Sequence, residues 1–301
     1  MSELISIALR FALYLDLMML FGLGLFGLYG LHAEQRRWLN LRAWMGLTGG
    51  LGLAFSVASL LVMTQSMSGA TDWQALWPHV QMMLWQSDLG LTWWVRIAAL
   101  VLAALSTHLA LATLSAGVAL ATLVWTGHGV MHEGVQGVWH IVSDSAHLLA
   151  AAGWVGALAA FGLLLMPAPL PQDDRVQVLA SALAGFERIG AGFVLVLIGT
   201  GVANYLFVVG PNLGGINGGV YAVLLCLKLG LFGVMLALAA LNRFHLTPLL
   251  QQSIAAGIIT WRSVRYGAAW PWSLALWCSS LAWWPGWAPW RLTKTVRFSG
   301  I

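Results

Sequence analysis

Charged residues are scarce in this sequence. Of its 301 residues only 8% are Asp, Glu, Lys or Arg, whereas a soluble domain has about 25%. Hydrophobic residues make up 60% and the mean hydropathy is +0.82, which excludes a soluble globular protein. The apolar runs are continuous and do not alternate with polar residues, so they predict helices rather than a β-barrel. We expect an all-α, polytopic transmembrane helical bundle, a single integral membrane domain over residues 1–301.

Cysteines and catalytic motifs are also lacking. Cys226 and Cys278 both lie inside apolar stretches, which argues against disulfide chemistry and favours small buried hydrophobes. No glycine-rich phosphate loop, HExxH motif or nucleophile elbow is present, and no segment could form a cytoplasmic ATPase domain. We therefore expect no enzyme. The net charge of +4 does not indicate nucleic-acid binding, because the basic residues collect beside the apolar runs, as membrane topology requires.

The apolar runs predict about eight membrane spans, since a spanning helix needs roughly 20 apolar residues. They lie at about residues 5–31, 43–64, 91–107, 109–126, 138–166, 186–209, 219–242 and 266–284. The third and fourth spans are separated only by Ser106-Thr107-His108, where we expect a tight hairpin.

The distribution of Lys and Arg predicts the orientation of these spans. The segments after the first and seventh spans are basic and should be cytoplasmic; they contain Arg36, Arg37, Arg42, Arg243, Arg262 and Arg265. Segments 65–90, 127–137 and 210–218 contain no Lys or Arg and should face outside. The N-terminus is then extracytoplasmic.

Four of the eight histidines fall between residues 127 and 156, at an outer membrane boundary. In a helix that begins near Val138, one stripe contains His140, Asp144, His147 and Trp154. A carboxylate beside histidines can orient an imidazole at a metal site. The plainer alternative is that Asp144 and His147 hydrogen-bond to each other between helices. His128 and His132, with Met131 between them, are further candidate ligands or loop residues at the interface.

Methionines form a second cluster at the same outer side. Met63 and Met67 are four residues apart at the end of the second span, and Met82 and Met83 follow in the next outer loop, with His79. Thioether and imidazole ligands together suit copper better than magnesium or calcium. A methionine in a membrane helix can also be a flexible gap filler, and zinc remains possible on the histidines alone.

A few other polar residues interrupt the spans. Asp16 lies midway along the first span, where an ionisable residue indicates a functional site. Lys228 lies about a third of the way into the seventh span, so Asp144 or Asp16 could be its partner. The remaining polar interruptions are Glu187-Arg188, Asn204 and Asn242-Arg243.

Several of these motifs together resemble the bacterial copper resistance protein CopD family. The matching pieces are Gly127-His128, Ser143 to Leu158, Phe186-Glu-Arg188, Gly199 to Asn204 and Lys228 to Pro248; with the eight-span plan they cover most of residues 1–265. The resemblance implies an inner-membrane protein of copper homeostasis that moves copper inward, often beside a CopC-like periplasmic copper-binding protein. His128, Asp144, His147 and Trp154 carry over with the family motif.

The C-terminal tail departs from that family. Residues 269–301 are rich in Trp and Pro and end in a basic segment, which eight spans would place outside. Trp is encoded by TGG. In a GC-rich gene the same triplet appears when a run of Leu-Gly or Leu-Ala codons is read in a shifted frame. We hypothesise that the residues from about 269 onward are read out of frame, which resequencing of the gene would decide.

The leading functional hypothesis is a copper permease in which His and Met residues capture copper outside and His147 and Asp144 pass it inward. A haem- or quinone-linked electron carrier is a second hypothesis. It is disfavoured because its histidine pair, His108 and His147, should lie at opposite depths. A third is a non-transporting partner of a periplasmic copper protein, which the sequence does not separate from a permease.

Overall fold

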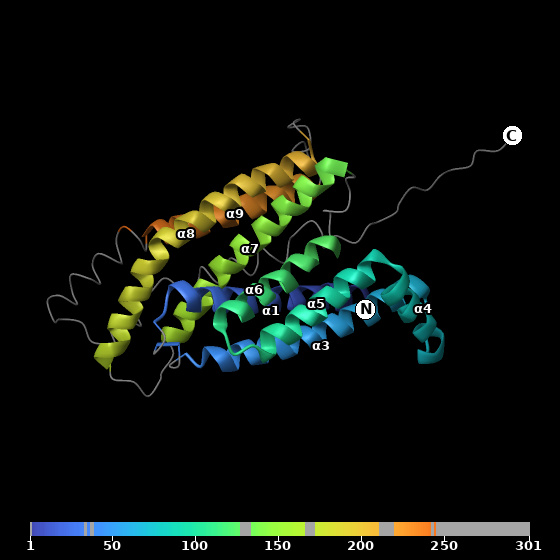
Figure 1. Cartoon of the computed structure of the whole chain (residues 1–301). Coiled ribbons are helices and arrows are strands. Elements are labelled where there is room, and N and C mark those ends of the chain that lie inside the picture. Colours follow the sequence, from blue (N-terminus) through green and yellow to red (C-terminus); the bar gives the residue numbers. More distant parts are fainter. Residues whose placement is uncertain are drawn as a thin grey trace.

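The computed structural model describes residues 2–32, 35–36, 39–126, 134–165, 172–210, 220–241 and 244. The long elements in this part of the chain are all helices. They are α1 (Ser2–Tyr29), α3 (Leu41–Ser68), α4 (Trp73–Gln86), α5 (Asp88–Leu105), α6 (Leu109–Ala121), the 3-10 helix η1 (Thr122–Thr126), α7 (Gly134–Leu165), α8 (Gln172–Val208) and α9 (Val220–Leu241). In Figure 1, α7 crosses between a group formed by α1, α3, α5 and α6 and helix α8, against which it packs. The predicted all-helical class is confirmed for these residues.

Seven of the eight predicted spans coincide with these helices. Five helical stretches are long and apolar enough to cross a membrane: Leu4–Tyr29, Leu41–Ser68, Asp88–Leu105, Gly134–Leu165 and Gln177–Val208. Two shorter apolar stretches, Leu109–Trp125 and Leu225–Ala237, complete the seven. The hairpin expected at Ser106-Thr107-His108 is confirmed, because α5 ends at Leu105 and α6 begins at Leu109. The chain is a multi-pass membrane protein.

Two boundaries differ from the prediction. The segment 65–90, predicted as an outer loop, contains α4, whose first turn is capped by Asp72 through a 2.8 Å bond from the Ala75 amide. Helix α8 begins at Gln172, well before the predicted start at residue 186. The polar residues at the start of α8 are helical despite their low hydropathy, which the prediction from apolar runs missed. Glu187 therefore lies in the interior of α8.

Helices α1 and α7 pack with their backbones in direct contact at two glycines. A β-carbon added to Gly156 would lie 2.1 Å from the carbonyl carbon of Gly22, and one added to Gly22 would lie 2.2 Å from the Ala152 oxygen. Only glycine allows such an approach. This close crossing places α7 at the centre of the molecule, where it also packs against α8.

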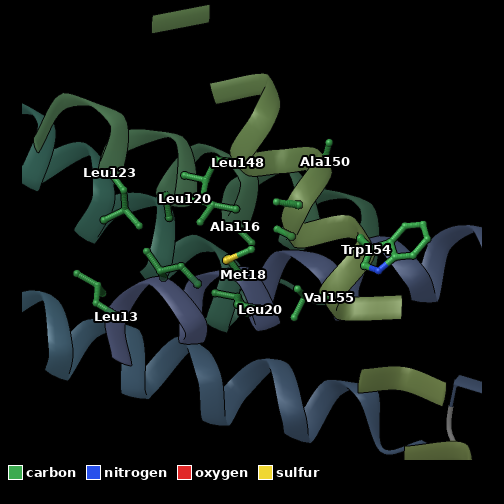
Figure 2. Packing of buried hydrophobic residues seen from close by; sticks show 14 of the residues in the cluster. Leu13, Met18, Leu20, Ala116, Leu120, Leu123, Leu148, Ala150, Trp154 and Val155 are labelled. Carbon is green, nitrogen blue, oxygen red and sulfur yellow. The ribbon is translucent and has the colours of Figure 1, made fainter. Parts of the chain in front are cut away.

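The core around this crossing is filled by small and branched side chains. Figure 2 shows labelled residues of this cluster from α1, α6, η1 and α7, with Trp154 extending away from the others; they are Leu13, Met18, Leu20, Ala116, Leu120, Leu123, Leu148, Ala150, Trp154 and Val155. All are buried. The close packing holds α7 in one rotational setting, which fixes the direction of its polar stripe.

Several predicted features lie outside the described residues. These are the eighth span, the tail 269–301, Cys278, and the candidate site residues His128, Met131, His132, Asn242 and Arg243. The expectation that both cysteines are buried is wrong for Cys226, which is exposed on α9.

Candidate functional site

The polar stripe of α7 faces α8 along its whole length. At the N-terminal end of the stripe His140, which is 1% exposed, stacks on Phe207 of α8 with ring centroids 5.0 Å apart. Further along, Trp154 makes an edge-to-face contact with Phe186, with centroids 5.4 Å apart. The aromatic contacts at the two ends set the register of the helix pair, and the hydrophilic members of the stripe lie between them.

Two hydrogen bonds join the middle of the stripe to α8. The Asn204 side-chain amide donates to Asp144 Oδ1 over 2.7 Å, and His147 Nδ1 lies 2.8 Å from Thr200 Oγ1. The Ser143 hydroxyl also donates to the Thr200 carbonyl oxygen, over 3.5 Å. Asp144 and His147 are thus each held by a different α8 residue. These bonds to α8 add to the contact between Asp144 and His147 that the sequence offered as the plainer alternative, which stays a prediction.

The hydrogen bonds of Thr200 decide which nitrogen of His147 carries the proton. The Thr200 hydroxyl donates its only hydrogen to the Val196 carbonyl oxygen, so toward His147 it acts as an acceptor. Nδ1 is then the donor toward Thr200, and in a neutral imidazole the lone pair lies on Nε2. A neutral imidazole oriented by a hydrogen bond from its other nitrogen is the form that ligates a metal ion.

A basic residue of α9 completes this group. Lys228 interacts electrostatically with both Asp144 and His147, attractively with the carboxylate. We call Asp144, His147, Thr200, Asn204 and Lys228 the α7–α9 cluster. It brings an anion, a cation and a neutral imidazole together between three apolar helices, where ionisable groups are stable only when paired.

The cluster by itself is not a complete metal site. Among the described residues, no three His, Cys, Asp or Glu side chains come together in a way that could hold a metal ion. His140 and His147 are both on α7 but make separate contacts with Phe207 and Thr200. The indole nitrogen of Trp154 is buried and has no hydrogen-bond partner among the described residues.

The methionine cluster lies at the junction of α3 and α4. The Thr64 hydroxyl lies 3.4 Å from the sulfur of Met83, which brings Met83 to the part of α3 whose sequence contains Met63 and Met67. Met67 is exposed, as are Met82 and His79. Met82 and Met83 are helical residues of α4 rather than loop residues, and the fold brings Met83 to Thr64.

The other predicted residues lie apart from this cluster. Asp16 is buried on α1 against Gly52 of α3. His108, considered as a partner of His147 for haem, is an exposed residue at the turn before α6.

Sequence reasoning did not select Thr200, Asn204 or Phe207 as site residues. Thr200 and Asn204 are polar residues four apart in an apolar span, which places them on one helix face. That spacing was the sequence feature from which a polar face on this helix could have been predicted. Nothing in the sequence indicates that this face meets the stripe of α7.

The fold and the cluster define a multi-pass helical membrane protein with ionisable side chains between its spans. Residues 1–138 match the family "Copper resistance protein D-like, N-terminal domain", and residues 180–278 match "Copper resistance protein D". Copper resistance protein D of Pseudomonas syringae pv. tomato is 45% identical over 283 residues, which cover 89% of this chain and 91% of that protein. The chain belongs to the copper resistance protein D family, which confirms the resemblance noted from its motifs and makes it a copper-related membrane protein.

A second relative is more distant. The inner membrane protein YebZ of Escherichia coli (strain K12) is 27% identical over 259 residues, which cover 82% of this chain and 86% of that protein. No solved structure matches the chain.

Proposed function

We propose that the protein is a copper carrier of the bacterial inner membrane that moves copper from the periplasm toward the cytoplasm, and that it is not an enzyme. Membership of the copper resistance protein D family supports the cargo. The name of the YebZ relative supports the membrane. The basic segments after the first and seventh spans support an extracytoplasmic N-terminus.

The observation that carries the proposal is the α7–α9 cluster. His147 supplies its imidazole nitrogen Nε2 to copper, and Lys228 neutralises Asp144 while the site holds no cargo. When a Cu(I) ion binds His147, Lys228 releases one proton, and the copper replaces its ammonium as the cation beside Asp144. The exchange of one proton for one Cu(I) keeps the buried charge balanced in both states, which the apolar surroundings require.

Capture takes place at the outer end of the bundle. Met63, Met67 and Met83 supply thioethers that suit Cu(I) and need no deprotonation at neutral pH. His128, Met131, His132 and His140 add ligands on the same side, and a CopC-like periplasmic protein delivers the ion there. Trp154, Asn242 and Arg243 belong to the inward part of the pathway.

The test is copper content and Cu(I) affinity of the purified protein, compared with His147→Ala and with Val142→Ala as the matched control. Val142 is an exposed residue of the same helix, two residues from Asp144, and its variant should bind copper like the wild type. Loss of copper in the His147 variant alone supports the proposal. Equal copper in all three proteins, or none in any, contradicts it.

A further inference from the structure

Asp16 is a buried acid that does not belong to the α7–α9 cluster. It lies at the middle of α1 and is 7% exposed, between Leu13, Leu17 and Leu20, which are 2% exposed or less. Its Oδ2 atom is buried and has no hydrogen-bond partner among the described residues. A carboxyl group in this position requires an explanation, because an unpaired ionised acid is costly in an apolar interior.

The space for this carboxyl oxygen is provided by a glycine of α3. A β-carbon added to Gly52 would lie 2.9 Å from Asp16 Oδ2 and 3.1 and 3.2 Å from methyl carbons of Leu17 and Leu100. The oxygen is therefore surrounded by the backbone of α3 and by leucine side chains. Any side chain at residue 52 would displace it.

A second unsatisfied oxygen lies one turn further along α3. Ser56 is fully buried and its hydroxyl has no partner among the described residues, although it shares a helix face with Gly52. Buried threonines in these helices behave differently. Thr48, Thr64 and Thr113 each donate to the carbonyl oxygen four residues earlier.

The charged and titratable groups of the surrounding helices do not neutralise Asp16. On α5 the Arg96 guanidinium donates to the side chain and the carbonyl oxygen of Thr122, and on α1 the Tyr14 hydroxyl donates to the Leu123 carbonyl oxygen. Helix α6 contains no titratable residue. The remaining groups on α1, α3, α5 and α7 are Glu3, Arg10, Tyr29, Arg42, Asp88, His140, Asp144 and His147.

We propose that Asp16 is a proton-binding site that takes up and releases one proton in each copper transport cycle. The coupling to copper rests on the proposed function; the binding of a proton does not. One buried carboxyl group provides too few oxygens for calcium, which takes six to eight, or for magnesium, which takes six. A proton needs only one acceptor and removes the charge that the apolar surroundings disfavour.

Infrared spectroscopy of the purified protein at neutral pH tests the site directly. Hydrated Asp and Glu side chains are ionised at this pH, so a carbonyl band of a protonated carboxyl reports a buried acid. We expect the band in the wild type and in the control Val57→Ala, an exposed neighbour of Ser56, and its loss in Asp16→Asn. No band in the wild type, or a band that persists in Asp16→Asn, overturns the proposal.

Proteoliposomes with a trapped pH-sensitive dye test the coupling. We expect copper-driven proton movement in the wild type and in Val57→Ala, and at least a tenfold loss in Asp16→Asn, with Cu(I) affinity changed less than twofold. Undiminished proton movement in Asp16→Asn, or transport driven by sodium instead of protons, overturns the coupling. If the wild type moves no copper, the proposed function and the coupling both fail, while the infrared band still decides whether Asp16 binds a proton.

Discussion

His147 Nδ1 lies 2.8 Å from Thr200 Oγ1, and the same hydroxyl donates to the carbonyl oxygen of Val196. This chain of bonds makes Nδ1 the nitrogen that donates to Thr200, so the lone pair of a neutral His147 lies on Nε2. A threonine that is not itself a metal ligand thereby determines which nitrogen can bind one.

Replacing Thr200 tests this role. Thr200→Val keeps the shape of the side chain but removes the acceptor for Nδ1–H, so we expect Cu(I) affinity to fall about 10- to 100-fold, as for other groups that orient a ligating histidine. Thr200→Ser keeps the hydroxyl and should bind like the wild type. The measurement is competition with a chromophoric Cu(I) chelator, and equal affinities for the Val and Ser variants would contradict the orienting role.

The attraction between Asp144 and Lys228 predicts a coupled effect on stability. Asp144→Asn leaves the Lys228 ammonium without its counter-charge between apolar helices, which should cost about 3 kcal/mol. Adding Lys228→Met should restore much of that loss. Thermal unfolding in detergent of the two single variants and the double variant measures the coupling, and strictly additive effects would show that the two residues do not pair.

The contact between α1 and α7 predicts that two glycines of one helix differ sharply in tolerance. Gly156→Ala places a methyl group inside the backbone of Gly22, so we expect a loss of about 3 kcal/mol, at the upper end for overpacking. Gly162→Ala is the control, because a β-carbon there meets nothing within 4 Å. The folded yield and melting temperature of both variants test this difference. Similar values for the two variants would argue against the close crossing of α1 and α7.

The spans and the α7 stripe could be predicted from the sequence because both depend on local pattern. Apolar run length located seven spans, and the spacing of His140, Asp144 and His147 placed them on one face. The amphipathic helix α4 was missed because its mixed composition and Pro78 resemble a loop. Asp72 before it was a readable N-cap signal.

The partners of the stripe could not be predicted from the sequence. Whether Thr200 and Asn204 meet His147 and Asp144 depends on which helix packs against α7 and in what rotational setting. That setting is fixed by the contact of Gly22 with Gly156, residues far apart in the chain that have no local signature.

The bond from Thr64 to Met83 predicts that methionines of two helices act together. In cells at limiting copper, we expect Met63→Leu, Met67→Leu and Met83→Leu combined to lower copper accumulation, because leucine keeps the volume and removes the soft ligands. At high copper the difference should disappear. Met82→Leu is the matched control, since it makes the same change at an exposed neighbour of Met83 on the same helix. A control that loses as much uptake as the triple variant would exclude a specific role for the three.

Copper influx into proteoliposomes tests the central claim most directly. Protein oriented with its N-terminus outward is given Cu(I) outside, and trapped copper is measured for the wild type, His147→Ala and Val142→Ala. We predict saturable influx for the wild type and Val142→Ala and influx at the level of protein-free vesicles for His147→Ala. Equal influx with and without the His147 imidazole would contradict the claim that copper crosses the membrane through the α7–α9 cluster.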